Sequence, residues 1–303
     1  MTDDSAFFSL PETGLAADGE MVCIHRSGCG WSELYRVCRG GRFRVLKALK
    51  PEYRGMSLYE SLLRKEFEIG YSLSHPNICE VYGFSDVPGL GRAIEMEWID
   101  GAPLSGVMAS GRIQGKTALR LADQLCDAVG YLHARQVVHR DIKLSNLMVT
   151  HNGNNLKIID FGLSDADSWA VLKGQGGTIG NASPEALAGG VSDCRSDIWS
   201  MGKVLSELVP SKRAVARRCM EQDPARRYQD AASVKAALHS HRGIVFLIVL
   251  ALLVSAAVSA LWNPFKAVEA PEPLPVQDSS SVVTDPAVID ELFRQATEMI
   301  DAN

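Results

Sequence analysis

The chain has 303 residues, of which 46% are hydrophobic and 22% are charged, and its formal net charge is -5. That length allows one large domain or two small ones, and the hydrophobic content excludes a largely disordered chain. The mildly acidic balance gives no reason to expect binding to nucleic acid.

The cysteines and the first residues indicate a reducing compartment and no secretion signal. Seven cysteines are scattered without CxxC spacing, which favours free thiols over disulfides or a zinc site. The opening MTDDSAFF is acidic and lacks the basic and apolar regions of a signal peptide. We expect residues 1–16 to form an N-terminal segment that precedes the first domain.

The stretch from Met21 to Lys50 predicts strands joined by tight turns. Gly40-Gly41 is typical of a hairpin, and FRVLKAL after it alternates with period two. Alternation places every second side chain on the same face of a strand, so Val45 and Lys47 share a face.

A helix, a strand and a second helix follow. In SLYESLLRKEFEIGYSLSHPNI, apolar residues recur at helical spacing before His75-Pro76 ends the segment. RAIEMEWIDG, from Arg92 to Gly101, predicts a strand that breaks into a loop. Between Lys116 and Ala134 a stripe of leucine and valine predicts a core helix.

The polar chemistry of the chain is concentrated in HRDIKLSNLMV, His139 to Val149, and IIDFG, Ile158 to Gly162. Phosphoryl transfer needs mainly positioning and charge neutralisation, for which carboxylates, an amide and an ammonium are suitable groups. The order and spacing of these motifs resemble the catalytic and metal-binding loops of eukaryotic-like (Hanks-type) serine/threonine protein kinases.

The resemblance implies a role for each polar residue of these loops. Asp141 would be the catalytic base, and Lys143 would reach the transferring phosphate. Asn146 and Asp160 would hold Mg²⁺, with Mn²⁺ as an alternative metal. ATP would be the phosphoryl donor.

The resemblance also implies a nucleotide site in the first half of the chain. Lys47 would bind the α- and β-phosphates of ATP, Val45 would cover the adenine and Met148 would lie beneath it. Counting back from HPNI places Glu66 where the family's glutamate pairs with the strand lysine. Glu68, on the opposite helix face, is the alternative.

The strand from Arg92 resembles the hinge between the two kinase lobes. Met96 would be the gatekeeper, and backbone groups of Glu97 and Ile99 would form hydrogen bonds with adenine. A plain buried strand is the alternative interpretation of this stretch.

The glycine-rich loop departs from the family pattern. If Leu34 takes the place of the usual valine, Ser32 stands at the third glycine, and Gly28 and Gly30 fall out of register. If Gly28 and Gly30 are kept in register, Glu33 falls on the third glycine. One glycine is missing in either case, which leaves the backbone less free to approach phosphate.

Later motifs complete the resemblance. GGTIGNASPEAL resembles the end of a kinase activation loop, in which Thr178 favours serine or threonine acceptors. Asp197 would hold the backbone of the catalytic loop, and Arg227 would pair with Glu185. VPSKRAVARRCMEQ, between these landmarks, is too short for an extra helix that most family members carry, so we expect a C-lobe trimmed after the Asp197 helix.

A membrane segment is expected near the C-terminus. From Gly243 to Trp262 the chain carries no charge over about 20 residues, the length that an α-helix needs to cross a bilayer. Residues 263–303 begin as a Pro/Ser-rich linker and end in a short, acidic, amphipathic helix. The positive-inside rule favours a cytoplasmic kinase domain and a tail outside.

We therefore expect an α+β fold, with a bilobal kinase-like domain over residues 17–242 and one transmembrane helix over residues 243–262 in the plasma membrane. The expected function is ATP-dependent phosphorylation of serine or threonine on protein substrates, with a homodimer through the membrane or tail segment as a further expectation. Two alternatives stay open. One is a pseudokinase scaffold, motivated by the missing glycine, and the other is a kinase-like small-molecule phosphotransferase.

Overall fold

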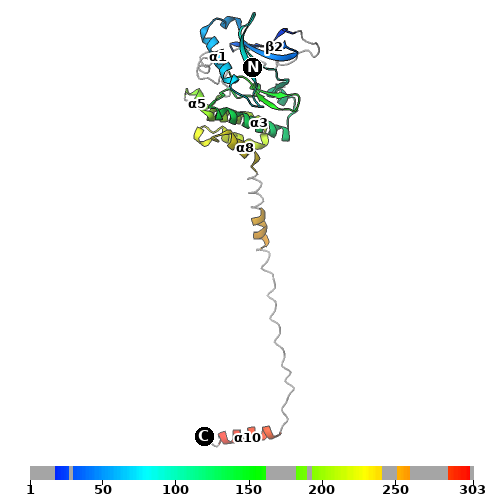
Figure 1. Cartoon of the computed structure of the whole chain (residues 1–303). Helices are drawn as coiled ribbons and strands as arrows, with labels where there is room; N and C mark the ends of the chain where they lie inside the picture. Colours follow the sequence, from blue (N-terminus) through cyan, green and yellow to red (C-terminus); the bar gives the residue numbers. More distant parts are fainter. Residues whose placement is uncertain are drawn as a thin grey trace. The chain divides into compact units, whose positions relative to one another are not determined.

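The computed structural model describes residues 18–26, 30–161, 182–189, 193–240, 251–259 and 286–300. The chain divides into two compact units, Met1–Ser240 and His241–Asn303. The first unit has a β-rich N-lobe and a helical C-lobe (Figure 1), so the predicted bilobal α+β fold is confirmed. The predicted boundary between residues 242 and 243 lies outside the described residues.

The N-lobe is a five-stranded antiparallel sheet with the strand order β1-β2-β3-β5-β4. Its strands are β1 (Met21–Arg26), β2 (Ser32–Arg39), β3 (Arg42–Leu49), β4 (Val81–Val87) and β5 (Gly91–Glu97). Gly40 and Gly41 form the predicted hairpin, and both have the positive φ that a two-residue hairpin turn of this kind requires.

Helix α1 (Ser57–Tyr71), which follows a short 3-10 turn at Pro51–Tyr53, packs against this sheet. Its apolar face is buried through Leu62 and Leu63, which join a cluster with residues of β3, β4 and β5. Burial of each leucine contributes about 2 kcal/mol relative to exposure. Glu66 lies on this buried face of α1 as well.

The C-lobe combines a small three-stranded sheet, of order β6-β7-β8, with a helical body. Its elements are β6 (Gly101–Pro103), α2 (Leu104–Ala109), α3 (Gly115–Ala134), η2 (Leu144–Asn146), β7 (Leu147–Thr150), β8 (Leu156–Ile158), α5 (Pro184–Leu187), α6 (Cys194–Leu208), η3 (Pro210–Lys212), α7 (Arg213–Cys219), η4 (Pro224–Arg226) and α8 (Ala231–His239).

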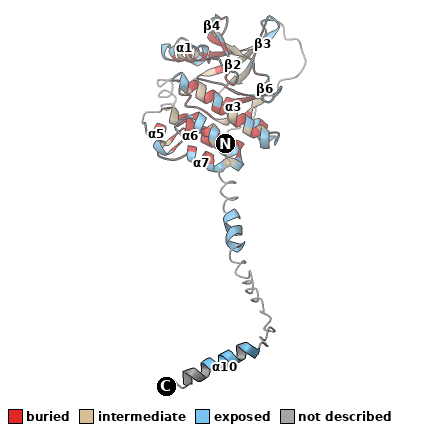
Figure 2. Cartoon of the chain, turned by 60° about the horizontal axis from the view of Figure 1, so that its bottom comes forward, coloured by how far each residue is buried: buried red, intermediate tan, exposed pale blue. Residues whose placement is uncertain are grey.

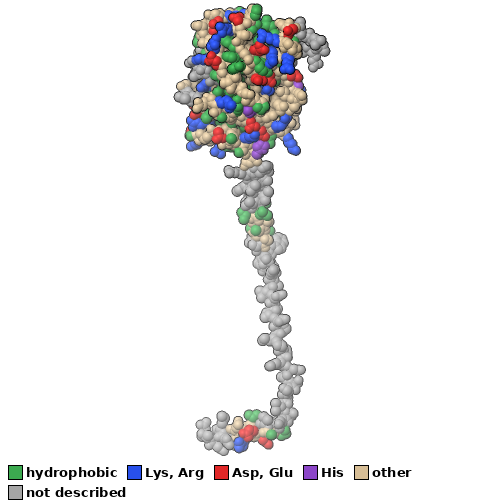
Figure 3. Space-filling model, viewed as in Figure 1, with side chains coloured by type: hydrophobic (Ala, Val, Ile, Leu, Met, Phe, Trp, Pro, Cys, Tyr) green, Lys and Arg blue, Asp and Glu red, His purple; other side chains and the backbone are tan. Residues whose placement is uncertain are grey.

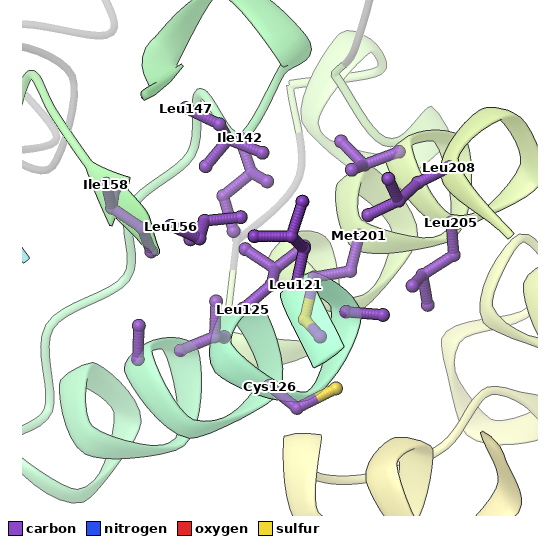
Figure 4. Close-up of a cluster of buried hydrophobic side chains, with 14 of the residues drawn as sticks. Leu121, Leu125, Cys126, Ile142, Leu147, Leu156, Ile158, Met201, Leu205 and Leu208 are labelled. Atoms are coloured by element: carbon purple, nitrogen blue, oxygen red, sulfur yellow. The ribbon is translucent and has the colours of Figure 1, made fainter. Parts of the chain in front are cut away.

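Helix α3 is the core helix that the sequence predicts, and its buried positions follow helical spacing. Helices α3 and α6 carry buried residues along their length within the C-lobe (Figure 2). Figure 4 shows side chains of α3 between those of β8 and those of α6, namely Leu121 and Leu125, Leu156 and Ile158, and Met201 and Leu205. This packing supports the strands that flank the catalytic motif.

The stretch between α6 and η4 is short, as expected for a trimmed C-lobe. Residues 209–222 hold only η3 and α7 as helical elements. Helix α7 lies so close to α6 that a Cβ at Gly202 would be only 2.7 Å from the Cβ of Cys219. Glycine at this position therefore permits the close contact between the two helices.

In the second unit, residues 251–259 are helical and α10 spans Pro286–Ile300. The first of these segments is apolar without charged side chains, whereas α10 carries both charged and hydrophobic ones (Figure 3). Within the described ranges, no helix is both long enough and apolar enough to span a bilayer. Much of the predicted span 243–262 falls outside those ranges.

An ion pair joins Glu185 of α5 to the buried Arg227, which follows η4. The two terminal nitrogens of Arg227 lie 2.8 Å from the two carboxylate oxygens of Glu185, and the Arg227 side chain is fully buried. The hydroxyl of Ser196 also donates to Glu185, at 2.9 Å. Burial alone would raise the pKa of Glu185, but hydrogen bonds from Arg227 and Ser196 contribute to lowering it to about 2.

We expect Glu185→Gln to lower the free energy of unfolding by about 3 kcal/mol at pH 7, because the variant leaves the buried guanidinium without its anion. The folded-state pKa of Glu185 is depressed, so its stabilisation is present above about pH 4.5 and is lost as the pH falls towards 2. Urea unfolding at stepped pH values measures both effects. Glu207→Gln, an exposed change on α6, is the control. If the free energy of unfolding changed with pH in the same way in wild type and Glu185→Gln, the pH dependence would not belong to Glu185.

Candidate active site

Lys47 of the N-lobe contacts residues of both lobes. It lies near the end of β3 with its side chain 8% exposed. Its Nζ lies 2.6 Å from Oε1 of Glu66 on α1 and 2.7 Å from Oδ1 of Asp160, which follows β8. The alternative partner, Glu68, is exposed. The structure thus brings Lys47, Glu66 and Asp160 together and selects Glu66 over Glu68.

The electrostatics of this cluster favour a charged lysine. Burial disfavours the ammonium of Lys47, but the carboxylates of Asp160 and Glu66 outweigh it and raise the pKa of Lys47 above its ordinary value. Burial raises the pKa of Glu66, against the opposing effect of Lys47. The second oxygen of Glu66 is buried and has no hydrogen-bond partner within the described part of the chain.

The catalytic loop has a strained backbone, which Asp197 of α6 holds in place. Arg140 has a φ of 64°, in the left-handed region that non-glycine residues rarely adopt. The backbone amides of His139 and Arg140 each donate to the carboxylate of Asp197 at 2.8 Å, and His133 lies 2.9 Å from it. Asp197 is fully buried on α6. The predicted contact of Asp197 with the catalytic-loop backbone is therefore confirmed.

Asp141 is oriented by two residues of its own loop. The side-chain amide nitrogen of Asn146 donates to the backbone oxygen of Asp141 at 3.0 Å and to its Oδ2 at 2.8 Å. Nζ of Lys143 lies 2.8 Å from the same Oδ2. Burial raises the pKa of Asp141, and Lys143 offsets part of this rise. A raised pKa makes this carboxylate a better proton acceptor than an ordinary aspartate.

Asn146 and Asp160 supply the oxygen atoms that suit a hard divalent cation. Because the amide nitrogen of Asn146 faces Asp141, its Oδ1 remains as an acceptor. The Asp160 side chain is 43% exposed, and Asp160 has a φ of 69°. The amide of Ile159 donates to the backbone oxygen of Asn146 at 3.0 Å, which ties the two segments together.

These two residues fit Mg²⁺, which usually binds through one or two protein oxygens, water and substrate phosphates. Among the described residues, no group of three or more His, Cys, Asp or Glu side chains is arranged to hold a metal ion by itself. When bound, the metal would neutralise charge on the phosphates.

The apolar part of the cleft draws on both lobes. Ile99 and Met148 are buried in one cluster with Cys79, and Met96 and Ile159 pack against it. The residues predicted as gatekeeper, hinge and adenine floor therefore lie together.

The register of the N-lobe sheet shows which face carries two further predicted residues. Val45 pairs with Met96 across β3 and β5, and Leu34 pairs with Lys47 across β2 and β3. Since paired residues of neighbouring strands lie on the same face of a sheet, Leu34 and Val45 share the face of Lys47.

Glu97 is engaged through both its backbone and its side chain. Its amide donates to the backbone oxygen of Glu80 at 2.9 Å, and its carboxylate lies 2.7 Å from Nζ of Lys157. The contact of the Glu97 backbone with adenine stays a prediction.

The glycine-rich loop is described only in part. Gly28 lies outside the described residues, while Gly30 is described immediately before β2. The pairing of Leu34 with Lys47 favours the register in which Ser32 stands at the third glycine. Glu33, which lies between Ser32 and Leu34, has a fully buried side chain. Thr178 also lies outside the described residues.

The burial of Glu33 is not predicted from the motif pattern, in which this residue is only a position of the glycine-rich loop. In the structure it belongs to β2. Strand alternation from Val37, a buried residue of β2, would have placed Glu33 on the buried face.

Comparison with known proteins agrees with this geometry. The model of the protein kinase domain family matches residues 30–242. Serine/threonine-protein kinase PrkC of Bacillus subtilis is 33% identical over 172 residues, which cover 55% of this chain and 26% of PrkC. Serine/threonine-protein kinase PknA of Mycobacterium tuberculosis is 35% identical over 186 residues, which cover 59% of this chain and 43% of PknA.

A solved structure shows the same fold. The crystal structure of the M. tuberculosis PknI kinase domain aligns with 75% of this chain and 99% of that domain, at a TM-score of 0.57 and 22% identity. The chain spans less than half the length of PrkC and PknA. The family match covers more than half of the chain. The chain therefore belongs to the protein kinase domain family.

Proposed function

We propose that this chain transfers the γ-phosphoryl group of ATP to serine or threonine hydroxyls of protein substrates, with Mg²⁺ as the metal. The observation that carries this proposal is the contact of Lys47 with both Glu66 and Asp160, at 2.6 and 2.7 Å. The names of the relatives PrkC and PknA, both serine/threonine-protein kinases, support the acceptor class. Membership of the kinase family supports the use of ATP and a divalent metal.

In this proposal the chain's own residues have distinct roles. Lys47 neutralises charge on the nucleotide phosphates, and Glu66 orients Lys47. Asp141 accepts the proton of the attacking hydroxyl while Lys143 neutralises the transferring phosphate. Catalysis then depends on positioning and on charge complementarity.

The two alternatives receive less support. A pseudokinase scaffold has no need to keep the base, the lysine and the carboxylates in mutual contact, yet Asp141 is held by Lys143 and Asn146. A small-molecule phosphotransferase is not favoured by the relatives, which are named as serine/threonine-protein kinases.

We also propose that the chain is anchored in the plasma membrane by residues 243–262, with the kinase domain in the cytoplasm and the tail outside. The uncharged run in the sequence supports this, as do the exposed apolar side chains of Leu252 and Leu253. Leu292 and Phe293 of α10 are exposed as well, which supports a homodimer formed through the tail.

We expect Asp141→Asn to lower phosphoryl transfer by about 10²–10⁴-fold, the usual contribution of a general base, and to retain nucleotide binding. Label transfer from ATP in the presence of Mg²⁺, to the detergent-solubilised chain itself and to a generic protein, measures the loss. Asp86→Asn, an exposed change on β4, is the control. Transfer that does not depend on Asp141 would contradict the mechanism, and no transfer by the wild type would favour the scaffold.

We expect Glu66→Gln to reduce kcat/KM for ATP by about 10–100-fold, because Lys47 loses a charged hydrogen-bond partner. Steady-state kinetics with varied ATP measures this reduction. Glu68→Gln is the matched control, since it changes a carboxylate on the exposed side of the same helix. Equal losses in the two variants would show that Glu66 has no special role.

We expect the double change Leu252→Arg and Leu253→Arg to release the chain from membranes, because each arginine near the centre of a span costs about 3 kcal/mol. Extraction of membranes with alkaline carbonate separates retained from released protein. Leu187→Arg, at an exposed leucine of α5, is the control. Release of the wild-type chain by carbonate would contradict the anchor.

A further inference from the structure

Glu33 is a buried carboxylate at the base of the loop between β1 and β2, and the chemistry above does not use it. Its side chain has no exposed surface. Three side chains from different parts of the N-lobe form hydrogen bonds with it, namely Arg26, Tyr35 and Arg54. We call Glu33 and the two arginines the Arg26–Glu33–Arg54 network.

The network joins the two strands that carry the glycine-rich loop. Arg26 is the last residue of β1, and its Nε lies 2.9 Å from Oε2 of Glu33. Glu33 is the second residue of β2, so the contact ties the residue before the loop to a residue just after it. The hydroxyl of Tyr35 donates to Oε1 of Glu33.

Arg54 extends the network to the end of β3 and to the turn between β4 and β5. Its Nη2 lies 3.1 Å from Oε1 of Glu33, and its Nε donates to the backbone oxygen of Leu49, the last residue of β3, at 2.9 Å. Its Nη1 donates to the backbone oxygen of Gly89, between β4 and β5, at 2.7 Å. Arg54 lies three residues before α1, which begins at Ser57.

A buried carboxylate is costly unless it is paired and hydrogen-bonded, and Glu33 meets both conditions. Because the Glu33 side chain is buried, its oxygens cannot turn to water, and the carboxylate keeps its hydrogen bonds to the neighbouring side chains. The loop lacks the third glycine, where Ser32 stands, so its backbone has less freedom to adjust to a phosphate.

We propose that Glu33 is a positioning residue for ATP. The Arg26–Glu33–Arg54 network holds the two ends of the loop between β1 and β2 at a set separation, and it links them to the end of β3 and the start of α1. This inference rests on the proposed function, because it requires ATP in the cleft.

The test is Glu33→Gln in the full-length, detergent-solubilised chain. Glutamine keeps the size of the side chain and removes the charge that attracts both arginines. We expect KM for ATP and Kd for a fluorescent ATP analogue to rise about 10-fold, with kcat within about 3-fold of wild type. The hydrogen bonds of Glu33 run to Arg26, Tyr35 and Arg54 within the N-lobe, which is why kcat should be preserved.

Arg26→Gln provides a variant that does not threaten folding, because the Arg26 side chain is 63% exposed. We expect Arg26→Gln to raise KM and Kd as well. The double variant with Glu33→Gln should raise both constants by less than the two single effects combined. Arg39→Gln, which breaks the pair between Arg39 and Glu95 at the other end of β2, is the matched control and should leave both constants unchanged.

Unchanged KM and Kd in both Glu33→Gln and Arg26→Gln, with only a lower melting temperature, would overturn the proposal and leave Glu33 a structural residue. A wild-type chain that binds the analogue but transfers no phosphate would contradict the proposed function alone, because Kd still decides the role of Glu33. A wild-type chain that binds no nucleotide would overturn both proposals.

Discussion

The arrangement of the site depends on one buried ammonium. Lys47 lies in the N-lobe sheet, where a lone charge would be costly, and it is compensated by Glu66 from α1 and Asp160 from the C-lobe. Because neither carboxylate is close to Lys47 in sequence, the contact forms only when sheet, helix and C-lobe pack together. The same interaction that satisfies a buried charge therefore assembles the groups that we propose to act on a nucleotide phosphate.

The C-lobe provides the rigid support for this assembly. Its core of α3, α6 and the short strands fixes where the catalytic loop begins and ends. Asp197 accepts both backbone amides at the strained turn of Arg140, and the buried pair of Glu185 and Arg227 holds the segment at α5. A strained backbone persists only where surrounding contacts determine it, and here those contacts come from α6.

The sequence alone predicts much of the fold and most of the candidate site. Period-two alternation marks β3, helical spacing marks α3, and the turn at Gly40 and Gly41 is visible because both signals are local. The spacing from Asp141 to Asn146 identifies the catalytic loop, because these residues are close in the chain and their chemistry is specific. Roles assigned through the family resemblance, such as the base and the metal ligands, stay predictions that kinetics must test.

What the sequence by itself determined is therefore several of the local elements, the family and the residue types available for phosphoryl transfer. Tertiary structure alone decided that Glu66 and not Glu68 pairs with Lys47, and that Glu33 is buried in contact with Arg54. The physical reason is that burial and pairing of a charge depend on contacts between distant segments: Lys47 and Asp160 are 113 residues apart. No local pattern along the chain carries that information.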